Sequence, residues 1–181
     1  MTAFVRAHRW QIAALVVAVC VVVAGKQYYR AASAGELGWI LAPTARLVSA
    51  VTGGHFVYEA GVGWVDRDAT FIIAPACAGV NFAMAAFLAL TLGGLAGMRT
   101  GRATAVRLAG AAAMAYGATL VVNTLRIALA IALHQGTIDL GGIDRGEVHR
   151  VEGILVYLGG LCALYAFAGM LERRGRHAVA R

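Results

Sequence analysis

Four long apolar stretches, separated by short polar segments, organise this chain. They cover about Trp10–Tyr29, Gly79–Met98, Val106–Leu129 and Val151–Leu171. A helix of about 20 apolar residues crosses the hydrocarbon core of a bilayer, so each stretch predicts a transmembrane helix. The third apolar pattern continues to His134, so the pattern does not fix the residue at which that helix ends.

The segment between the first and second stretches shows two further patterns. Glu36–Val51 has apolar side chains at helical spacing, at Leu37, Ile40, Leu41, Ala45, Leu47 and Val48. This spacing predicts an amphipathic helix on the outer membrane surface. His55–Ala74 alternates instead, with glycines and acidic residues between its apolar runs. That alternation predicts a short β-hairpin leading to Pro75.

Composition agrees with a bilayer as the solvent of this chain. Of its 181 residues, 60% are hydrophobic and 14% are charged, which is less charge than a soluble domain carries. The formal net charge of +7 could suggest nucleic acid, but the basic residues form short clusters between apolar runs. Such clusters are typical of a topology signal. We expect one integral membrane domain, residues 1–181, surrounded by membrane lipids and without a nucleic-acid partner.

The charges also predict an orientation. Basic clusters flank the apolar stretches at Arg6, Arg9, Arg99, Arg102, Arg107, Arg173, Arg174, Arg176 and Arg181. Four spans place all of these on one side, which the positive-inside rule identifies as the cytoplasm. The acidic residues of the connecting segments fall on the other side, at Glu36, Glu59, Asp66, Asp68, Asp139, Asp144 and Glu147. We expect a multi-pass protein of the plasma (inner) membrane with both termini cytoplasmic.

The first stretch also fits a signal peptide, because two arginines precede its apolar run. No A-x-A-like site precedes a polar region, however, and Lys26, Tyr28, Tyr29 and Arg30 fit an interfacial anchor. These features favour an uncleaved helix.

Cys77 lies in the segment Pro75-Ala76-Cys77-Ala78-Gly79, where the predicted strand ends and a membrane helix begins. A thiol at a helix N-terminus is favoured as thiolate by the positive end of the helix dipole. The alternative is a small buried residue at a helix start. Cys20 and Cys162 lie inside apolar runs, near the middle of the bilayer, and the three cysteines give no disulfide framework.

Arg126 lies in the third stretch, in Asn123-Thr124-Leu125-Arg126-Ile127. It follows Arg107 by roughly 28 Å of helix, which places it near the outer boundary of the bilayer. A charge there should face protein or a water-filled cavity, unless the arginine extends to the outer headgroups. Asn123 shares its helix face and could orient its neighbours.

His149 lies at the outer end of the fourth stretch and can titrate near neutral pH. Glu152, three residues later, could hold its imidazole. The alternative is a histidine of an interfacial loop, and His55 and His134 share its predicted side. The His-x-x-Glu spacing supplies only two ligands, too few for a metal site, and we expect no cofactor.

Topology thus places Cys77, Arg126 and His149 at one membrane face, although each is far from the others in sequence. A nucleophile, a fixed cation and a proton carrier at one depth form a plausible set for acyl transfer. Cys77 would attack a carbonyl, Arg126 would stabilise the oxyanion and His149 would protonate the leaving amine.

The chain resembles the exosortase/archaeosortase family, most closely the short exosortase K type. The resemblance lies in three segments on successive spans, Pro75-Ala76-Cys77-Ala78-Gly79, Asn123-Thr124-Leu125-Arg126-Ile127 and His149-Arg150-Val151-Glu152-Gly153. The resemblance implies an α-helical cysteine transpeptidase or protease that cleaves the C-terminal sorting tail of a membrane-anchored substrate protein. It implies Cys77 as nucleophile, Arg126 as charge stabiliser and His149 as acid/base. The resemblance does not identify the substrate motif, the acceptor or the oligomeric state. It also leaves open whether the enzyme transfers the product to an acceptor or only hydrolyses the bond.

Two functions from other classes also fit a small membrane protein. A channel or transporter subunit could use Arg126 and Asn123 to line an anion path. A non-catalytic assembly factor could pack through glycine-rich helix faces. The third stretch carries alanine and glycine below Asn123, so a continuous polar path is not expected.

Overall fold

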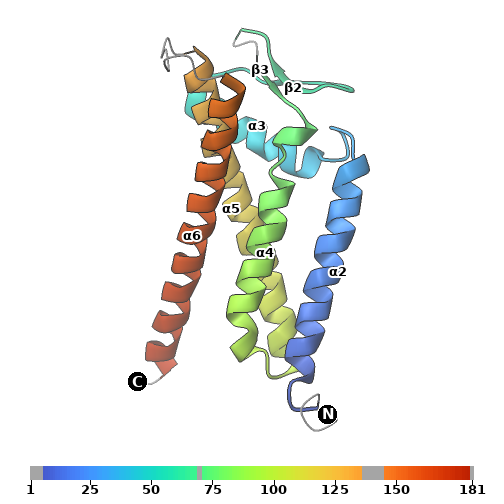
Figure 1. The fold of residues 1–181 in the computed structure, drawn as a ribbon, viewed down its shortest axis with the longest axis vertical. Helices are drawn as coiled ribbons and strands as arrows, with labels where there is room; N and C mark the ends of the chain where they lie inside the picture. The colour runs from blue at the N-terminus through green and yellow to red at the C-terminus, as the bar shows by residue number, and fades with distance from the viewer. Residues whose placement is uncertain (1–5, 69–70, 136–144, 180–181) are drawn as a thin grey trace. The chain divides into compact units, whose positions relative to one another are not determined.

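The computed structural model describes residues 6–68, 71–135 and 145–179 (Figure 1). Long helices dominate it. In chain order, the main elements are α2 (Arg9–Ala31), α3 (Gly38–Thr52), β1 (Val57–Glu59), β2 (Gly63–Asp66), β3 (Phe71–Ile73), α4 (Val80–Gly94), α5 (Gly101–Gln135) and α6 (Arg145–Val179). Two short 3-10 turns flank α4, at Pro75–Cys77 and Leu95–Gly97.

Four helical segments of the described chain are long and apolar enough to cross a membrane. They cover Arg9–Ala31, Pro75–Gly97, Gly101–His134 and Arg150–Leu171. The four long helices predicted from the sequence are therefore confirmed as helices, and the third continues beyond Leu129. Their outward side chains suit lipid, since large apolar residues such as Val121 and Leu155 are 67% and 64% exposed; apolar surface of this extent is rare on soluble monomers.

Contacts along the chain define two compact units. Unit 1 comprises residues 1–28, 81–118 and 161–181, and unit 2 comprises residues 29–80 and 119–160. The helices α2, α4, α5 and α6 contribute residues to both. The expectation of a single domain over residues 1–181 stays a prediction.

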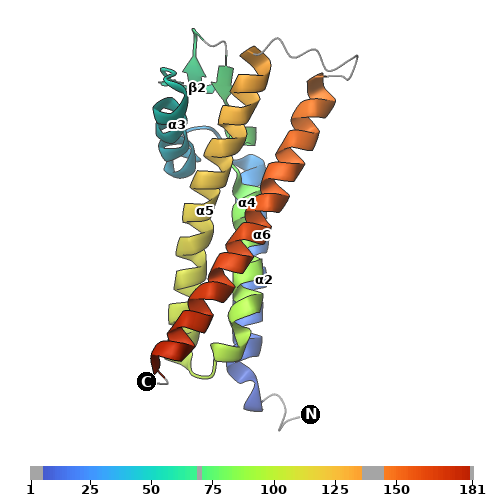
Figure 2. The same ribbon diagram turned by 90° about the vertical axis from the view of Figure 1, so that its left-hand side faces the viewer.

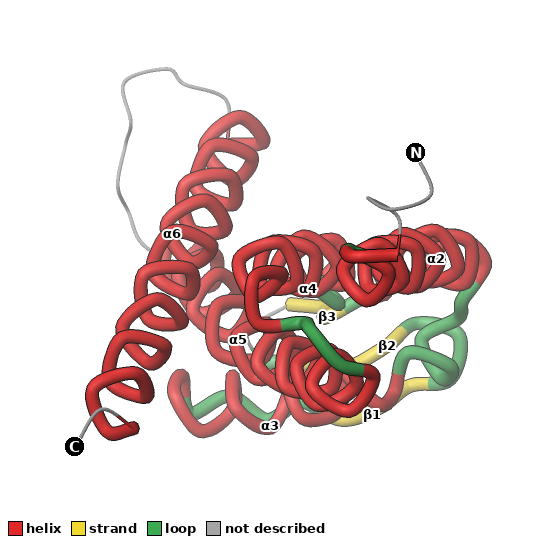
Figure 3. The backbone as a smooth tube through the Cα atoms, turned by 90° about the horizontal axis from the view of Figure 1, so that it is seen from below, coloured by secondary structure: helices red, strands yellow, loops and turns green. Residues whose placement is uncertain are grey.

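Unit 1 contains the contact between α2 and α4, which lie side by side in Figures 1 and 3. Near the end of α2, Lys26 Nζ donates a hydrogen bond of 2.9 Å to Asn81 Oδ1 in the first turn of α4. At the other end of α2, the ring of Trp10 lies against Gly101, where an added Cβ would meet it at 2.9 Å. Gly101 thus lets the ring of Trp10 on α2 approach the start of α5 closely.

Unit 2 contains a three-stranded antiparallel sheet of order β1-β2-β3. The prediction of a two-stranded hairpin over His55–Ala74 is therefore incomplete, because Gly63–Asp66 forms a middle strand that pairs with both neighbours. A tight turn joins β1 to β2, where the amide of Val62 donates to the carbonyl of Glu59 at 3.2 Å. Gly61 adopts φ +79° between β1 and β2, a conformation that favours glycine. After β2, the buried Asp66 accepts a hydrogen bond from the backbone N–H of Asp68 at 3.1 Å.

The amphipathic helix predicted over Glu36–Val51 is α3, which contacts β2 (Figure 2). Its buried face carries Ile40, Leu41, Ala45 and Val48, as the helical spacing predicted, and also Thr44, which the predicted apolar set did not include. Leu47 is 40% exposed and lies off that face. Before the helix, the amide and hydroxyl of Ser33 donate to Glu36 Oε2 at 2.8 and 2.7 Å, and these bonds lower the pKa of the Glu36 carboxyl.

Candidate functional site

Cys77 lies in the turn that joins β3 to α4. The strand ends at Ile73, whose side chain is fully buried, and Pro75 then begins a 3-10 turn. The amide of Cys77 donates to the carbonyl of Ala74 at 2.8 Å. The helix begins at Val80, three residues after the cysteine rather than directly behind it. The thiol side chain is partly exposed, so it is accessible without being on an open surface.

Gly79 separates the cysteine from the helix because it adopts φ +69°. A Cβ at this position would meet Asn123 Cγ and Thr119 Cγ2, each at 3.1 Å. Glycine is therefore required at this position for two reasons, the left-handed backbone and the close approach to α5. The backbone reversal at Gly79 turns the Cys77 segment against α5.

Asn123 of α5 fixes this turn. Its side chain is fully buried, and its Nδ2 donates a hydrogen bond of 2.6 Å to the carbonyl oxygen of Cys77. Asn123 was expected to orient its neighbours, and the neighbour it holds is the backbone of the proposed nucleophile. A buried amide that lost this acceptor would carry a desolvation penalty of about 1–3 kcal/mol.

Tyr157 of α6 completes the amide's hydrogen bonds. Its hydroxyl donates to Asn123 Oδ1 at 2.9 Å. The guanidinium of Arg126 lies over the same ring, with Cζ 5.3 Å from the ring centroid. Sequence reasoning missed Tyr157. A weak signal existed, because Tyr157 follows His149 and Gly153 at intervals of four residues on one helix.

Arg126 packs closely on α6. A Cβ at the buried Gly153 would lie 3.0 Å from Arg126 Nε, so the absence of a side chain there leaves room for the guanidinium. Both carboxylate oxygens of Glu152 are buried, and the carboxylate interacts electrostatically with Arg126. In the structure the Glu152 carboxylate thus interacts with Arg126, whereas the sequence suggested His149 as its partner.

Tyr29, at the end of α2, is a second tyrosine of the site. Its hydroxyl donates to the carbonyl of Pro75 at 3.3 Å and interacts electrostatically with Cys77 and Arg126. The sequence suggested only an interfacial aromatic here. Its position beside the turn could not be read from periodicity, since 46 residues separate it from Pro75.

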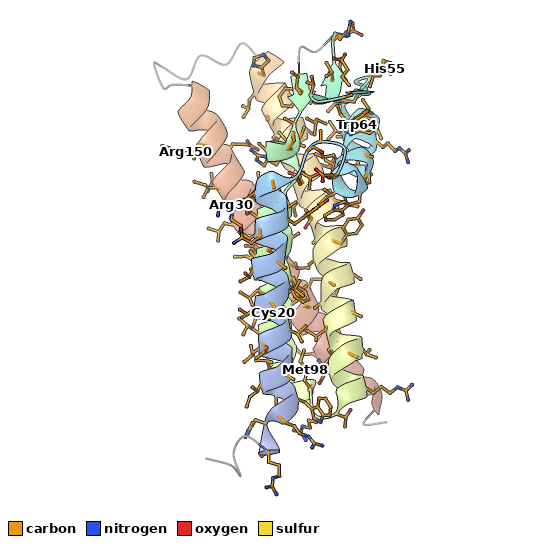
Figure 4. The ribbon with its side chains drawn as sticks, turned by 90° about the vertical axis from the view of Figure 1, so that its right-hand side faces the viewer. Cys20, Arg30, His55, Trp64, Met98 and Arg150 are labelled. Carbon is orange, nitrogen blue, oxygen red and sulfur yellow. The ribbon has the colours of Figure 1, made fainter. Side chains whose placement is uncertain are left out.

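His149 lies in the first turns of α6, one turn before Gly153. Its side chain lies outside the described part of the structure, so its role and its pairing with Glu152 stay predictions. Of the two alternative histidines, His55 is exposed in the loop before β1, and in Figure 4 it lies on the opposite side from Arg150 of α6. His134 is exposed, two turns beyond Arg126 on α5.

Cys20 and Cys162 are exposed and belong to unit 1, whereas the residues around Cys77 belong to unit 2. Within residues 6–68, 71–135 and 145–179, no three His, Cys, Asp or Glu side chains are grouped to hold a metal ion. The site therefore offers a thiol, a guanidinium, a carboxylate, an amide and two phenols. These groups suit nucleophilic attack and stabilisation of a developing negative charge.

No family model, curated protein or solved structure matched the chain.

Proposed function

We propose that this chain is a membrane-embedded cysteine transpeptidase or protease. It cleaves C-terminal sorting tails of exported, membrane-anchored proteins at the extracytoplasmic face and passes the product to an acceptor or to water. The observation that carries the proposal is the hydrogen-bonded chain from the Cys77 carbonyl through Asn123 to Tyr157, with Arg126 over the Tyr157 ring. The resemblance to exosortases supports the same roles.

In the proposed reaction the Cys77 thiolate attacks the carbonyl carbon of the scissile peptide bond. A carbon–sulfur bond forms and the carbonyl electrons move to oxygen, where the positive charge of Arg126 stabilises them. The carbonyl then re-forms, the carbon–nitrogen bond breaks and His149 gives a proton to the leaving amine. An acceptor nucleophile or water, deprotonated by His149, attacks the resulting thioester and releases the thiolate.

The burial of Asn123 argues against the channel alternative. Its side chain is fully buried, and its nitrogen and oxygen bond to Cys77 and Tyr157. An amide held in this way does not line a water-filled path. The arrangement instead suits a rigid support for a reactive turn.

Cys77→Ala, in cells that hold a candidate tailed substrate, tests the proposal. We expect tail cleavage to fall by roughly 10³-fold or more, since removal of the covalent nucleophile of a protease costs this much or more. Cys20→Ala and Cys162→Ala are matched controls and should cleave at the wild-type rate. Tail cleavage that survives Cys77→Ala would eliminate the proposed nucleophile.

The proton carrier is tested in the same assay. His149→Ala should lower cleavage by about 10²- to 10⁴-fold, the usual contribution of general acid–base catalysis. His55→Ala and His134→Ala should leave it within about twofold, because the proposal assigns the proton transfer to His149 and both of these imidazoles are exposed. A loss confined to either alternative variant would transfer the role to that histidine.

A further inference from the structure

Tyr157 contacts two of the proposed functional groups at once. Its hydroxyl bonds to Asn123, which in turn bonds to the carbonyl of Cys77. Its ring lies beneath the guanidinium of Arg126. One side chain of α6 therefore links the α5 cation to the turn that carries the thiol.

Both contacts constrain direction as well as distance. A cation attracted to an aromatic face prefers the position above the ring, which limits where the planar guanidinium of Arg126 can lie. The hydrogen bond from the hydroxyl holds the outer end of the ring in place, because its acceptor Asn123 is fully buried and cannot move easily. The phenol of Tyr157 also interacts electrostatically with both Arg126 and Cys77.

We infer that Tyr157 is a positioning residue that holds the Arg126 guanidinium beside the Cys77 thiol. The inference rests on the proposed function for its catalytic meaning. The placement of the guanidinium, in contrast, can be tested without any substrate. Tyr157 acts through Arg126, because its own proton is committed to the Asn123 oxygen. A misplacement of about 1 Å in a stabilising group can lower a rate by about 10²-fold, so loss of this support should be visible in the chemistry.

Alkylation of Cys77 by two reagents tests the placement without a substrate. The full chain carrying Cys20→Ser and Cys162→Ser is treated at one pH with iodoacetate, which is anionic, and with iodoacetamide, which is neutral. The ratio of the two rates cancels the thiolate fraction and the access to the thiol. A guanidinium near the sulfur should raise this ratio by about three- to tenfold, and Arg126→Ala defines the ratio without it.

Tyr157→Leu should lower the ratio most of the way to the Arg126→Ala value, because the ring is lost. Tyr157→Phe should keep it within about twofold of the starting protein, because the ring remains under the guanidinium while the hydroxyl's hydrogen bonds to Asn123 and Arg126 are lost. Tyr165→Leu, eight residues further along α6 and exposed, is the matched control and should keep the starting ratio. Adding Tyr157→Leu to Arg126→Ala should change nothing further.

A starting ratio that Arg126→Ala does not lower would overturn the inference, as would a Tyr157→Leu ratio equal to that of the starting protein. Equal loss in the Phe and Leu variants would also overturn it, since the ring would then have no separate role. These outcomes are distinct from failure of the proposed function. Tail cleavage that persists in Cys77→Ala would refute the peptidase proposal while leaving the alkylation result intact.

Discussion

Gly79→Ala perturbs the candidate site without changing any of its functional side chains, and its cost can be worked from two separate terms. An L-residue at φ +69° costs about 1–2 kcal/mol relative to glycine. The new methyl would also meet Asn123 Cγ and Thr119 Cγ2 at 3.1 Å. Both of those side chains are fully buried, so neither has room to move, and overpacking of this kind costs about 1–3 kcal/mol. We expect a total loss of about 2–5 kcal/mol in the free energy of unfolding.

Gly53→Ala separates the two terms. Gly53 ends α3 at φ +76°, close to the value at Gly79, and nothing lies within 4 Å of where its Cβ would be. Its substitution should therefore show only the backbone term, about 1–2 kcal/mol. The difference between the two variants, about 1–3 kcal/mol, measures the contact between the Cys77 turn and α5.

The assay is equilibrium unfolding of the full chain in detergent micelles, followed by far-UV circular dichroism. A Gly79→Ala loss no larger than that of Gly53→Ala would refute the packing of the turn on Asn123. Asn123→Ala supplies a cross-check. It removes Asn123 Cγ at 3.1 Å but leaves Asn123 Cβ at 3.3 Å and Thr119 Cγ2 at 3.1 Å. The clash is relieved in part, so its cost and that of Gly79→Ala should sum to more than the double variant loses.

Two further predictions concern unit 2. Gly153→Ala places a methyl 3.0 Å from Arg126 Nε and should lower tail cleavage by at least about tenfold by displacing the guanidinium. Gly159→Ala, on the same helix with open space at its Cβ, should cleave normally and gain about 0.5–1 kcal/mol in unfolding free energy from helix propensity; similar cleavage by the two variants would contradict the packing. Asp66→Ala removes a buried acceptor of the backbone amides of His55 and Asp68 and should lower the unfolding free energy by about 1–3 kcal/mol. A loss below about 0.5 kcal/mol, the usual range for surface changes, would show that the carboxylate does not order the sheet.

The long helices could be predicted because their cause is local. A run of about 20 apolar residues is long enough to span a bilayer and reads directly from the chain. The sheet was harder, since Gly63–Asp66 is short and holds only Trp64 and Val65 as strand-forming residues. Its strand identity depends on partners on both sides, and a pattern confined to four residues does not predict two partners.

The depth of the site residues in the bilayer could be predicted from the sequence, whereas the rotation of each helix about its axis could not. Counting residues along helices of known rise predicts depth, which is why Cys77, Arg126 and His149 could be expected at one face. The angle at which each helix presents its side chains depends on packing against neighbours 34 to 46 residues away. That angle decides that Arg126 lies over Tyr157 and near Glu152, and that Asn123 bonds to the Cys77 carbonyl. Apolar helices with little amphipathic contrast leave this rotation unspecified in sequence, so the polar contacts between them can be located only once the helices are packed.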